Sequence, residues 1–565
     1  MIKSYLSIAL RYMIRHKGFS FINIAGLTIG IACSLLIVLY IQDETRYDTF
    51  HPDAARIYRA GSHGMLQGKK MLSVYAGAPL ANTLQQTCRQ VESVTRIASW
   101  ATFPMRYEDR VFTEPRLLLA DSNFFHFFHF QLIEGNIDSV LTGIRKLVIT
   151  ESAARRYFDY KGAGDRTPLG KTMVLAQGYT AKVSGIAADP PLNSHFHFTA
   201  ILSLSSWDDI HTNGWVTGRA ITYLKLKPDA SILPVEEKLK VFVARYINPE
   251  LEQLKRVNIN QLNNQGNSLG FFIQPLLDIH LYSHLDDEIE PNGNIQYIYL
   301  FSAIAVFITL LACINFMNLS TARSASRAKE VGVRKTVGAP TSRLIIQFIL
   351  ESFFYIVIAI LFALFIVSIL LLPFNILAEK QLSVRVFLSP IFLAGLPLFA
   401  VVVGLLAGSY PAFYLTTFSP IEVMRGRIRS RMRKYSIRNV LVIFQFFISA
   451  SLIIATLVVY RQLQYIQQAS LGFDKHNVVN LLHTRNLGNN GMRFKEELLK
   501  HQSIVAASYC NRLPPNIDWQ FVFSTTSPSQ DYLLNVYEMD YDHLKTMKYT
   551  MITGRFFSSD FLSDS

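Results

Sequence analysis

Five long apolar runs divide the chain, and polar segments of very different lengths separate them. The runs cover residues 19–41, 295–317, 344–372, 386–413 and 440–460, and Glu351 in the third run is their one charged residue. An uncharged apolar stretch of about 18 residues is long enough to cross a bilayer as a helix. The pattern therefore predicts an α-helical membrane protein with five spans.

The first run resembles a secretory signal peptide at its start, because basic residues precede it and small residues lead to Cys33. Its apolar residues continue well beyond Cys33, however, and such a peptide has a shorter apolar region. We interpret residues 19–41 as an uncleaved membrane anchor.

The net charge of +14 comes from three polar segments, residues 1–18, 318–343 and 414–439. They hold 17 basic and 2 acidic residues, which leaves 38 basic and 39 acidic residues in the rest of the chain. In a five-span topology all three segments lie on one side of the membrane, as the positive-inside rule requires. We expect them in the cytoplasm and residues 42–294 outside. The charge therefore requires no nucleic acid as a partner.

Residues 42–294 alternate between strand-like and helix-like patterns. Strands are predicted at 56–60, 146–150, 179–189 and 221–227, and helices at 78–90, 151–158 and 235–247. Short apolar runs with turn signals favour strands, whereas an apolar stripe at helical spacing favours helices. We expect a large α+β or α/β domain outside the membrane, between the first two spans, with a strand order that the sequence does not reveal.

Part of this domain is repeated near the C-terminus. Residues 121–136 (DSNFFHFFHFQLIEGN) align with 540–555 (DYDHLKTMKYTMITGR), so that Asp121 pairs with Asp540 and Gly135 with Gly554. The basic lead-in and first anchor also recur at residues 433–455. Two matches in the same order indicate a duplicated unit, with a partial second outside domain at 461–565. We expect that the natural gene product is longer than 565 residues or that this copy is non-functional.

Two motifs have some features of a cofactor or metal site. The segment GDRTPLGKT (164–172) approaches a phosphate-binding loop, but Gly164 is one residue early and Asp165 takes the required position. It predicts a turn before a strand. His195 and His197, with Asp189 nearby, could ligate a metal from one face of a strand, but a polar strand edge is the simpler interpretation. Residues 124–130 (FFHFFHF) predict a helix that packs aromatic rings into a core. We expect no cofactor, metal or catalytic group.

The polar segment between the second and third spans has the composition of a short helix. Glu330 and Arg334 can pair at i,i+4, Gly338 can end the helix, and Thr341 or Ser342 can cap the third span. One apolar side is predicted from Ala328, Val331, Val333 and Val337. Taken alone, such a helix has either a solvated charged face or a surface that lies on anionic headgroups.

This segment closely resembles the most characteristic stretch of MacB/FtsX/LolC-type ABC transporter permeases. Those proteins share the pattern Arg/Lys-Glu-[IV]-Gly-[IVL]-Arg-Lys-x-[IVLM]-Gly-Ala, which residues 329–339 match as KEVGVRKTVGA. Residues 11–32, 167–198 and 409–426 are also similar to the family's lead-in, outside domain and exit from the fourth span. The architecture resembles the eight-span branch, of which this chain holds five spans.

The resemblance implies a mechanism. In the family, the helix after the second span is a coupling helix that docks on a separate cytoplasmic ABC ATPase dimer. The coupling residues expected here are Lys329, Glu330, Val331, Gly332, Val333, Arg334, Lys335, Val337, Gly338 and Ala339. The chain itself would be no enzyme. It would transmit force through the inner membrane to export or extract a peptide, antibiotic, siderophore or lipoprotein.

Further partners follow from the same resemblance: a second copy or paralogue of the permease, and a membrane-fusion or other periplasmic protein. One alternative is an FtsX-like signalling scaffold whose outside domain activates a cell-wall hydrolase, although the large duplicated domain favours the transporter. Another alternative, a membrane-anchored enzyme, depends on His195 and His197 alone.

The charge distribution predicts the topology directly. In intact spheroplasts, an impermeant thiol reagent should label Ser205→Cys in the outside domain, and it should not label Ser326→Cys in the cytoplasmic segment. The reverse labelling pattern would contradict the predicted orientation.

Overall fold

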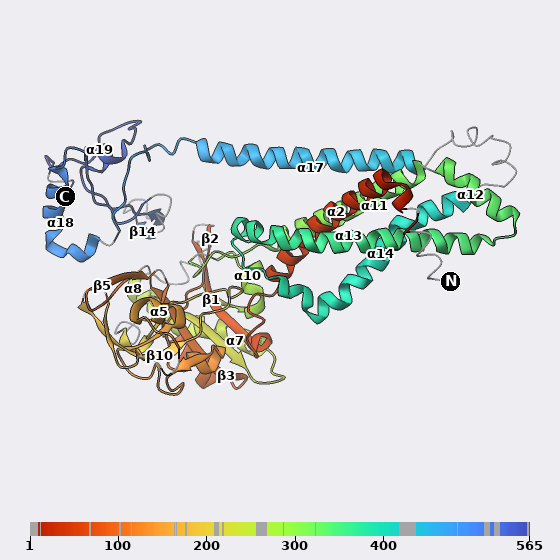
Figure 1. Cartoon of the computed structure of the whole chain (residues 1–565). Helices are drawn as coiled ribbons and strands as arrows, with labels where there is room; N and C mark the ends of the chain where they lie inside the picture. The colour runs from red at the N-terminus through yellow and green to blue at the C-terminus, as the bar shows by residue number, and fades with distance from the viewer. Residues whose placement is uncertain are drawn as a thin grey trace.

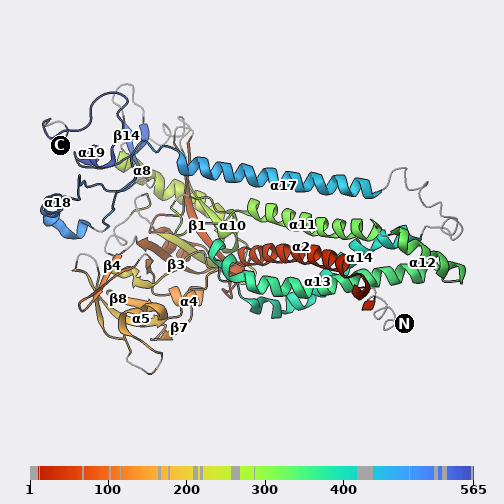
Figure 2. The same ribbon diagram turned by 45° about the horizontal axis from the view of Figure 1, so that its top comes forward.

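The structure contains a bundle of long helices with folded regions at one end and a short helix at the other (Figure 1). The computed structural model describes residues 10–564 except 12, 67–68, 101–102, 115, 163, 165–166, 176–177, 208–213, 217–219, 256–267, 286, 323, 417–436, 483, 514–519, 525–530 and 562–563. At one end of the bundle lie a large sheet-containing domain, here called the α/β domain, and a smaller C-terminal region. A short helix, α12, lies at the other end, as both views show (Figures 1 and 2).

Five helices are long and apolar enough to cross a membrane. They are α2 (Lys17–Glu44), α11 (Ile295–Ala322), α13 (Thr341–Ala378), α14 (Pro390–Thr416) and α17 (Ile437–Gln468). The five predicted spans are therefore confirmed as helices. Each extends past its predicted run at one end or both, but α14 begins at Pro390, and the first residues of the run 386–413 belong to a separate 3₁₀ turn. A short 3₁₀ turn, η6 (Val384–Leu388), lies between α13 and α14.

Small residues let the spans approach one another closely. A Cβ atom added to Gly30 of α2 would lie 2.7 Å from the Cβ of Ala312 in α11. On α14, Gly404 and Gly408 face α13, and a Cβ on Gly408 would lie 2.9 Å from the Cβ of Ser352. Small residues spaced four apart are typical of helix pairs in membranes, where close packing replaces the hydrophobic effect as the source of association.

The fifth span, α17, packs differently from the other four. It contacts α11, where Asn318 Nδ2 donates to Gln445 Oε1 at 3.2 Å, and most of its apolar surface is exposed. The core of the bundle instead comes from α2, α11, α13 and α14.

The α/β domain contains one mixed sheet with short helices around it. Its strands are β1 (Ile57–Leu66), β2 (Lys69–Ser73), β3 (Val91–Trp100), β4 (Phe103–Tyr107), β5 (Arg110–Glu114), β6 (Leu117–Ala120), β7 (Leu132–Glu134), β8 (Lys146–Thr150), β9 (Thr172–Val174), β10 (Thr180–Ala187), β11 (Ala200–Ser203), β12 (Ile221–Leu226) and β13 (Ser268–Pro275). Its helices are η1 (Ala54–Arg56), α3 (Leu80–Thr87), α4 (Phe124–Phe128), α5 (Glu151–Phe158), η3 (Leu204–Ser206), α7 (Leu233–Phe242), the π-turn η4 (Val243–Ile247), α8 (Asn248–Lys255), η5 (Leu276–Asp278) and α10 (Ile279–Tyr282).

The strand order is β13-β1-β12-β3-β6-β11-β8-β10-β9-β4-β5, with β2 beside β1 and β7 beside β10. The pairs β6–β11 and β8–β10 are parallel, and the other pairs are antiparallel. The central strands β6, β11 and β12 are buried along their whole length, because side chains on both faces enter hydrophobic clusters. The apolar sequences of β6 and β11 are expected for strands covered on both sides, whereas β12 also buries Thr222 and Lys225.

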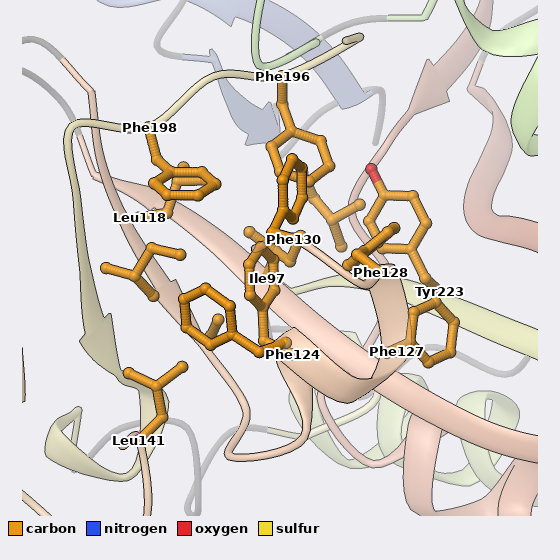
Figure 3. Close-up of a cluster of buried hydrophobic side chains, with 14 of the residues drawn as sticks. Ile97, Leu118, Phe124, Phe127, Phe128, Phe130, Leu141, Phe196, Phe198 and Tyr223 are labelled. Atoms are coloured by element: carbon orange, nitrogen blue, oxygen red, sulfur yellow. The ribbon is translucent and has the colours of Figure 1, made fainter. Parts of the chain in front are cut away.

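The predicted aromatic helix is confirmed as α4. Phe124, Phe127 and Phe128 are buried against Phe196 and Tyr223, and the close-up shows these rings meeting at the centre of one core cluster (Figure 3). Large aromatic side chains contribute much of the burial in such a core and prefer tilted or edge-to-face contacts. The first and last residues of α4 both belong to this cluster, so its aromatic residues pack the core of the domain.

The C-terminal region repeats the local geometry around α4. It contains η7 (Thr484–Asn490), α18 (Gly491–Leu499), a hairpin of β14 (Gln520–Ser524) and β15 (Asp531–Asn535), and α19 (His543–Met547). In the alignment α19 falls exactly on α4. The residues that follow the two helices, His129 and Lys548, both adopt left-handed conformations, with φ of 59° and 51°.

The aligned aspartates also make the same contacts. An Asp121 carboxylate oxygen accepts a hydrogen bond from the backbone N–H of Arg96 at 2.8 Å, and an Asp540 oxygen accepts from that of Tyr509 at 2.9 Å. Each aspartate N–H donates back to the carbonyl of the same residue. Gly135 and Gly554 both have positive φ, 110° and 83°. These parallels in backbone geometry agree with the duplicated unit predicted from the sequence.

A buried histidine makes the stability of the α/β domain depend on pH. His51 Nδ1 lies 2.7 Å from the carbonyl oxygen of Phe128. Burial lowers the pKa of His51 from 6.5 to about 4. Between these two values the unfolded chain binds more protons than the folded one, so stability present above pH 6.5 is lost as the pH falls towards 4.

We predict that replacing Gly30 with leucine separates α2 from α11, because the new side chain has no space beside Ala312. Overpacking of this kind typically costs about 1–3 kcal/mol. The thermal unfolding midpoint of the detergent-solubilised protein should fall for Gly30→Leu. It should change little for Gly18→Leu on the same helix, where no neighbour lies within 4 Å. Equal unfolding midpoints for Gly30→Leu and Gly18→Leu would contradict the close contact between α2 and α11.

The titration of His51 gives a second prediction. Its contribution to the unfolding free energy should fall by up to about 3 kcal/mol between pH 6.5 and 4. Urea unfolding of the full chain, followed by tryptophan fluorescence at several pH values, should show a shallower loss in acid for His51→Asn. The control Ile144→Asn, at an exposed position without a titratable group, should retain the wild-type pH dependence.

Candidate functional site

The candidate coupling helix, α12 (Ser324–Thr336), lies between α11 and α13 at the end of the bundle opposite the α/β domain (Figure 2). Its backbone is described from Ser324 and its side chains from Glu330, so the side chains of Ala328 and Lys329 lie outside the described part. Both views agree that α12 and the α/β domain are separated by the length of the spans (Figures 1 and 2).

The C-terminus of α12 is closed by a glycine turn, as the sequence predicts. Gly338 has φ of 92°, its N–H donates to the carbonyl of Lys335, and the N–H of Ala339 donates to that of Arg334. This pair of bonds is the Schellman motif, which satisfies the last carbonyl groups of a helix. The predicted capping of α13 by Thr341 or Ser342 is wrong. Thr341 is already the first helical residue, and Pro340 occupies the N-cap without a side-chain hydrogen bond.

An apolar contact fixes α12 to the ends of two spans. Val331 is 2% exposed and packs in a cluster with Leu344 and Phe348 of α13 and Ala412 and Leu415 of α14. Gly332, next to it, is also buried. One turn of α12 is therefore part of the same packed unit as α13 and α14.

Polar contacts from the next turn attach α12 to the same two helices. Arg334 Nη1 donates to Oε1 of the buried Gln347 in α13 at 2.8 Å, and Arg334 Nη2 pairs with Glu330 at 2.6 Å. Lys335 Nζ donates to the carbonyl of Thr416, the last residue of α14, at 2.5 Å. A lysine at a helix C-terminus satisfies a free carbonyl and complements the helix dipole.

The apolar side predicted for α12 is split in the structure. Val331 faces the spans, whereas Val333 and Val337 are 54% and 83% exposed. The expectation of one apolar side is wrong because residues 331 and 333 are about 200° apart around a helix and Val337 lies beyond its last turn. The result is a segment with one face bound to α13 and α14 and one face that carries two uncovered valines.

Sequence reasoning missed the two anchoring partners Gln347 and Thr416. Gln347 gave a signal, since it is a polar residue close to the start of an otherwise apolar run. Thr416 gave none, because its backbone carbonyl makes the contact and any residue type carries that group.

The histidines considered as metal ligands have separate partners. His195 is buried, with Nδ1 2.8 Å from Asp48 Oδ1 and Nε2 2.8 Å from the Tyr223 hydroxyl. His197 Nδ1 instead lies 2.8 Å from Glu290 Oε2. The prediction of a strand edge is wrong, since this segment is coil, and the two rings take part in different contacts that hold the coil to the domain.

Asp189, the third group considered with these histidines, accepts hydrogen bonds from the hydroxyl and the backbone N–H of Ser152. The segment that resembles a phosphate loop is only partly described, because residues 165 and 166 lie outside the described part. Its last residues form a turn, with Gly170 at φ 83°, and lead into β9 as predicted.

Comparison with known families matches two parts of the chain. Residues 20–241 match the MacB-like periplasmic core domain, and residues 302–420 match the FtsX-like permease C-terminal domain. The chain belongs to the MacB/FtsX-type ABC transporter permeases. The second match contains α12 together with the ends of α13 and α14 that hold it, and the first contains most of the α/β domain. The protein is therefore a membrane permease with an extracytoplasmic domain.

The similarity to individual proteins covers part of the chain at low sequence identity. The chain is 31% identical over 130 residues to a macrolide export ATP-binding/permease protein MacB of Bdellovibrio bacteriovorus, a match that spans 22% of this chain and 19% of that protein. A domain of a putative permease from Porphyromonas gingivalis is 23% identical, with a TM-score of 0.35, over 44% of this chain and 98% of that domain. The periplasmic region of MacB from Actinobacillus actinomycetemcomitans is 18% identical, with a TM-score of 0.26, over 40% of this chain and 91% of that region.

Proposed function

We propose that this chain is the membrane subunit of an ABC transporter of the mechanotransmission type. In this function a separate cytoplasmic ATPase dimer hydrolyses ATP and moves α12, and the spans carry that movement to the extracytoplasmic domain, which exports or extracts a substrate. The N-terminus and α12 then lie in the cytoplasm of a bacterium, and the spans lie in its inner membrane. A second permease, either an identical copy or a paralogue, completes the membrane part.

The observation that carries this proposal is the two-sided character of α12. Val331, Arg334 and Lys335 attach it to α13 and α14. On its other side Val333 and Val337 are exposed. A helix attached on one side moves together with the spans, and exposed apolar groups on the other side suit a protein contact.

A lipid surface explains the same geometry less well. A helix that lies on headgroups normally presents a continuous apolar face towards the acyl chains and basic residues towards the phosphates. Here the basic side chains of Arg334 and Lys335 point into contacts with α13 and α14. The described outer face instead combines two valines with Glu330, a carboxylate that anionic headgroups would repel.

We predict that Val333→Asp and Val337→Asp each release the ATPase. Either change places a carboxylate in the proposed contact, and an unpaired buried charge typically costs several kcal/mol. Binding should therefore weaken by about 100-fold or more. The measurement is copurification of the ATPase with the tagged permease from its native host, together with ATP-dependent function.

Two controls accompany this experiment. Ser324→Asp adds the same charge to the same helix, and Val111→Asp makes the same substitution at an exposed valine of the α/β domain. Both should retain the ATPase, and all four variants should reach the membrane with a folded domain. If the Val333 and Val337 variants retain the ATPase as well as these controls do, the coupling assignment is wrong.

A further inference from the structure

A cluster of charged and aromatic side chains lies where the bundle meets the α/β domain. It consists of Asp43, Glu44, Tyr47, His280 and Lys380, and is called the outer junction here. Asp43 and Glu44 end α2, Tyr47 follows them, His280 belongs to α10 of the domain, and Lys380 lies just after α13. The cluster therefore joins two spans and the extracytoplasmic domain at one point.

Lys380 is the centre of the outer junction. Its Nζ lies 2.6 Å from Glu44 Oε1 and 3.0 Å from Asp43 Oδ2, and it donates to the Tyr47 hydroxyl at 3.2 Å. Burial alone would lower the pKa of Lys380, but the hydrogen bond to Glu44 and the charges of nearby groups raise it above its usual value. The amine stays charged, so the ion pair persists at every pH at which these carboxylates are ionised.

His280 connects the domain to the same carboxylate. Its Nε2 lies 2.8 Å from Glu44 Oε2, and its ring stacks on that of Tyr47 with centroids 3.3 Å apart. Gly293, just before α11, also closes on this point, since a Cβ atom there would lie 2.8 Å from Glu44 Oε2 and 2.9 Å from His280 Nε2. The segment that leads from the domain into α11 therefore also passes the carboxylate of Glu44.

The backbone that carries Lys380 is held in a defined shape. Asn375 Nδ2 donates to the carbonyl of Leu382 at 2.8 Å, and the N–H of Leu382 donates to Asn375 Oδ1 at 3.0 Å. Glu379 adopts a left-handed conformation with φ of 52°, and the N–H of Lys380 donates to the carbonyl of Asn375. These bonds fix the direction of Lys380 relative to α13, which makes its contacts more than the chance pairing of a long side chain.

Glu44 also has the Tyr40 hydroxyl as a hydrogen-bond partner, but Lys380 supplies the cation that balances its charge. It is 6% exposed, and its two oxygens are used by Lys380 and His280. Removing one member of a buried ion pair leaves an uncompensated charge and is strongly destabilising. Separation of Lys380 from the end of α2 would create this unpaired charge, and His280 joins the domain to the same carboxylate, so the outer junction resists their separation.

We propose that Lys380 is a positioning residue that holds the extracytoplasmic domain to the α13–α14 hairpin, so that the domain follows the movement of these spans. This inference rests on the proposed function, in which α12 moves α13 and α14 at their other end. The attachment itself is a property of this chain alone and is testable without the ATPase.

The test uses the full chain in lipid nanodiscs, with spin labels at Ser205→Cys in the domain and Leu388→Cys in η6. Both positions are exposed, and the background lacks Cys33 and Cys510, the two cysteines that are not buried. We expect one narrow distance distribution for the wild type and a distribution about twofold broader or more for Lys380→Met. Amide exchange in α10 should rise by about tenfold or more, which corresponds to about 1.4 kcal/mol.

The controls test whether the effect depends on the positive charge at residue 380 in particular. Lys380→Arg, which keeps the charge, should retain the narrow distribution. Arg385→Met removes an exposed cation five residues along the same connection and should also retain it. If Lys380→Met does not fold, the double variant Glu44→Gln/Lys380→Met removes both charges and should broaden the distribution in a folded protein. A narrow distribution in whichever of these variants folds overturns the proposal.

The two proposals fail in different ways. Lys380→Met should copurify with the ATPase at the wild-type level, because α12 lies at the opposite end of the spans. A broad distribution with normal ATPase binding supports both proposals. Absence of an ATPase from the wild-type preparation contradicts the proposed function, while the widths of the distance distributions still decide the role of Lys380.

Discussion

The hydrocarbon interior of a membrane requires every backbone polar group to be satisfied within the protein, and long continuous helices meet this requirement. That constraint determines the design of this chain. The four packed spans are long helices that use most of their N–H and C=O groups internally, and prolines interrupt this pattern at Pro373 of α13 and at Pro397 and Pro411 of α14. Their contacts with one another come from small residues such as Gly30 and Gly408, which bring backbones together without charged groups. Polar chemistry is concentrated at the two ends.

Different contacts attach the neighbouring elements at the two ends of the bundle. At one end, α12 is attached through the Val331 cluster and through Arg334 and Lys335. At the other, Lys380 and His280 meet on the carboxylate of Glu44. In both places a basic side chain contacts an acceptor on a neighbouring helix, outside the hydrocarbon where ions are costly. Because α13 packs against Val331 of α12 at one end and Lys380 follows its other end, it connects the two attachments directly.

The spans, several elements of the domain and the end of α12 could be predicted from sequence because each has a local cause. An uncharged run has one favourable structure in lipid, residues 146–158 form the strand and helix that their pattern predicts, and Gly338 adopts the conformation that glycine permits. The strand order and the outer junction could not be predicted. Glu44, His280 and Lys380 are at least 100 residues apart in the sequence, and each looks like an ordinary surface charge until the fold brings them together. The side of α12 that faces the spans could not be predicted either, because Val331 and Val333 are the same residue type and differ only in their position around the helix.

The length of α13 has a consequence for how far the ends can move. Its 38 residues, at about 1.5 Å each, make a rod of about 57 Å, whereas the hydrocarbon core is about 30 Å thick. Nearly half of the helix therefore extends beyond the core. A tilt of about 10° about one end would displace the other end by about 10 Å. If α13 moves as a rigid body, a small angular change at α12 would therefore displace the segment at Lys380 by about the spacing between packed helices.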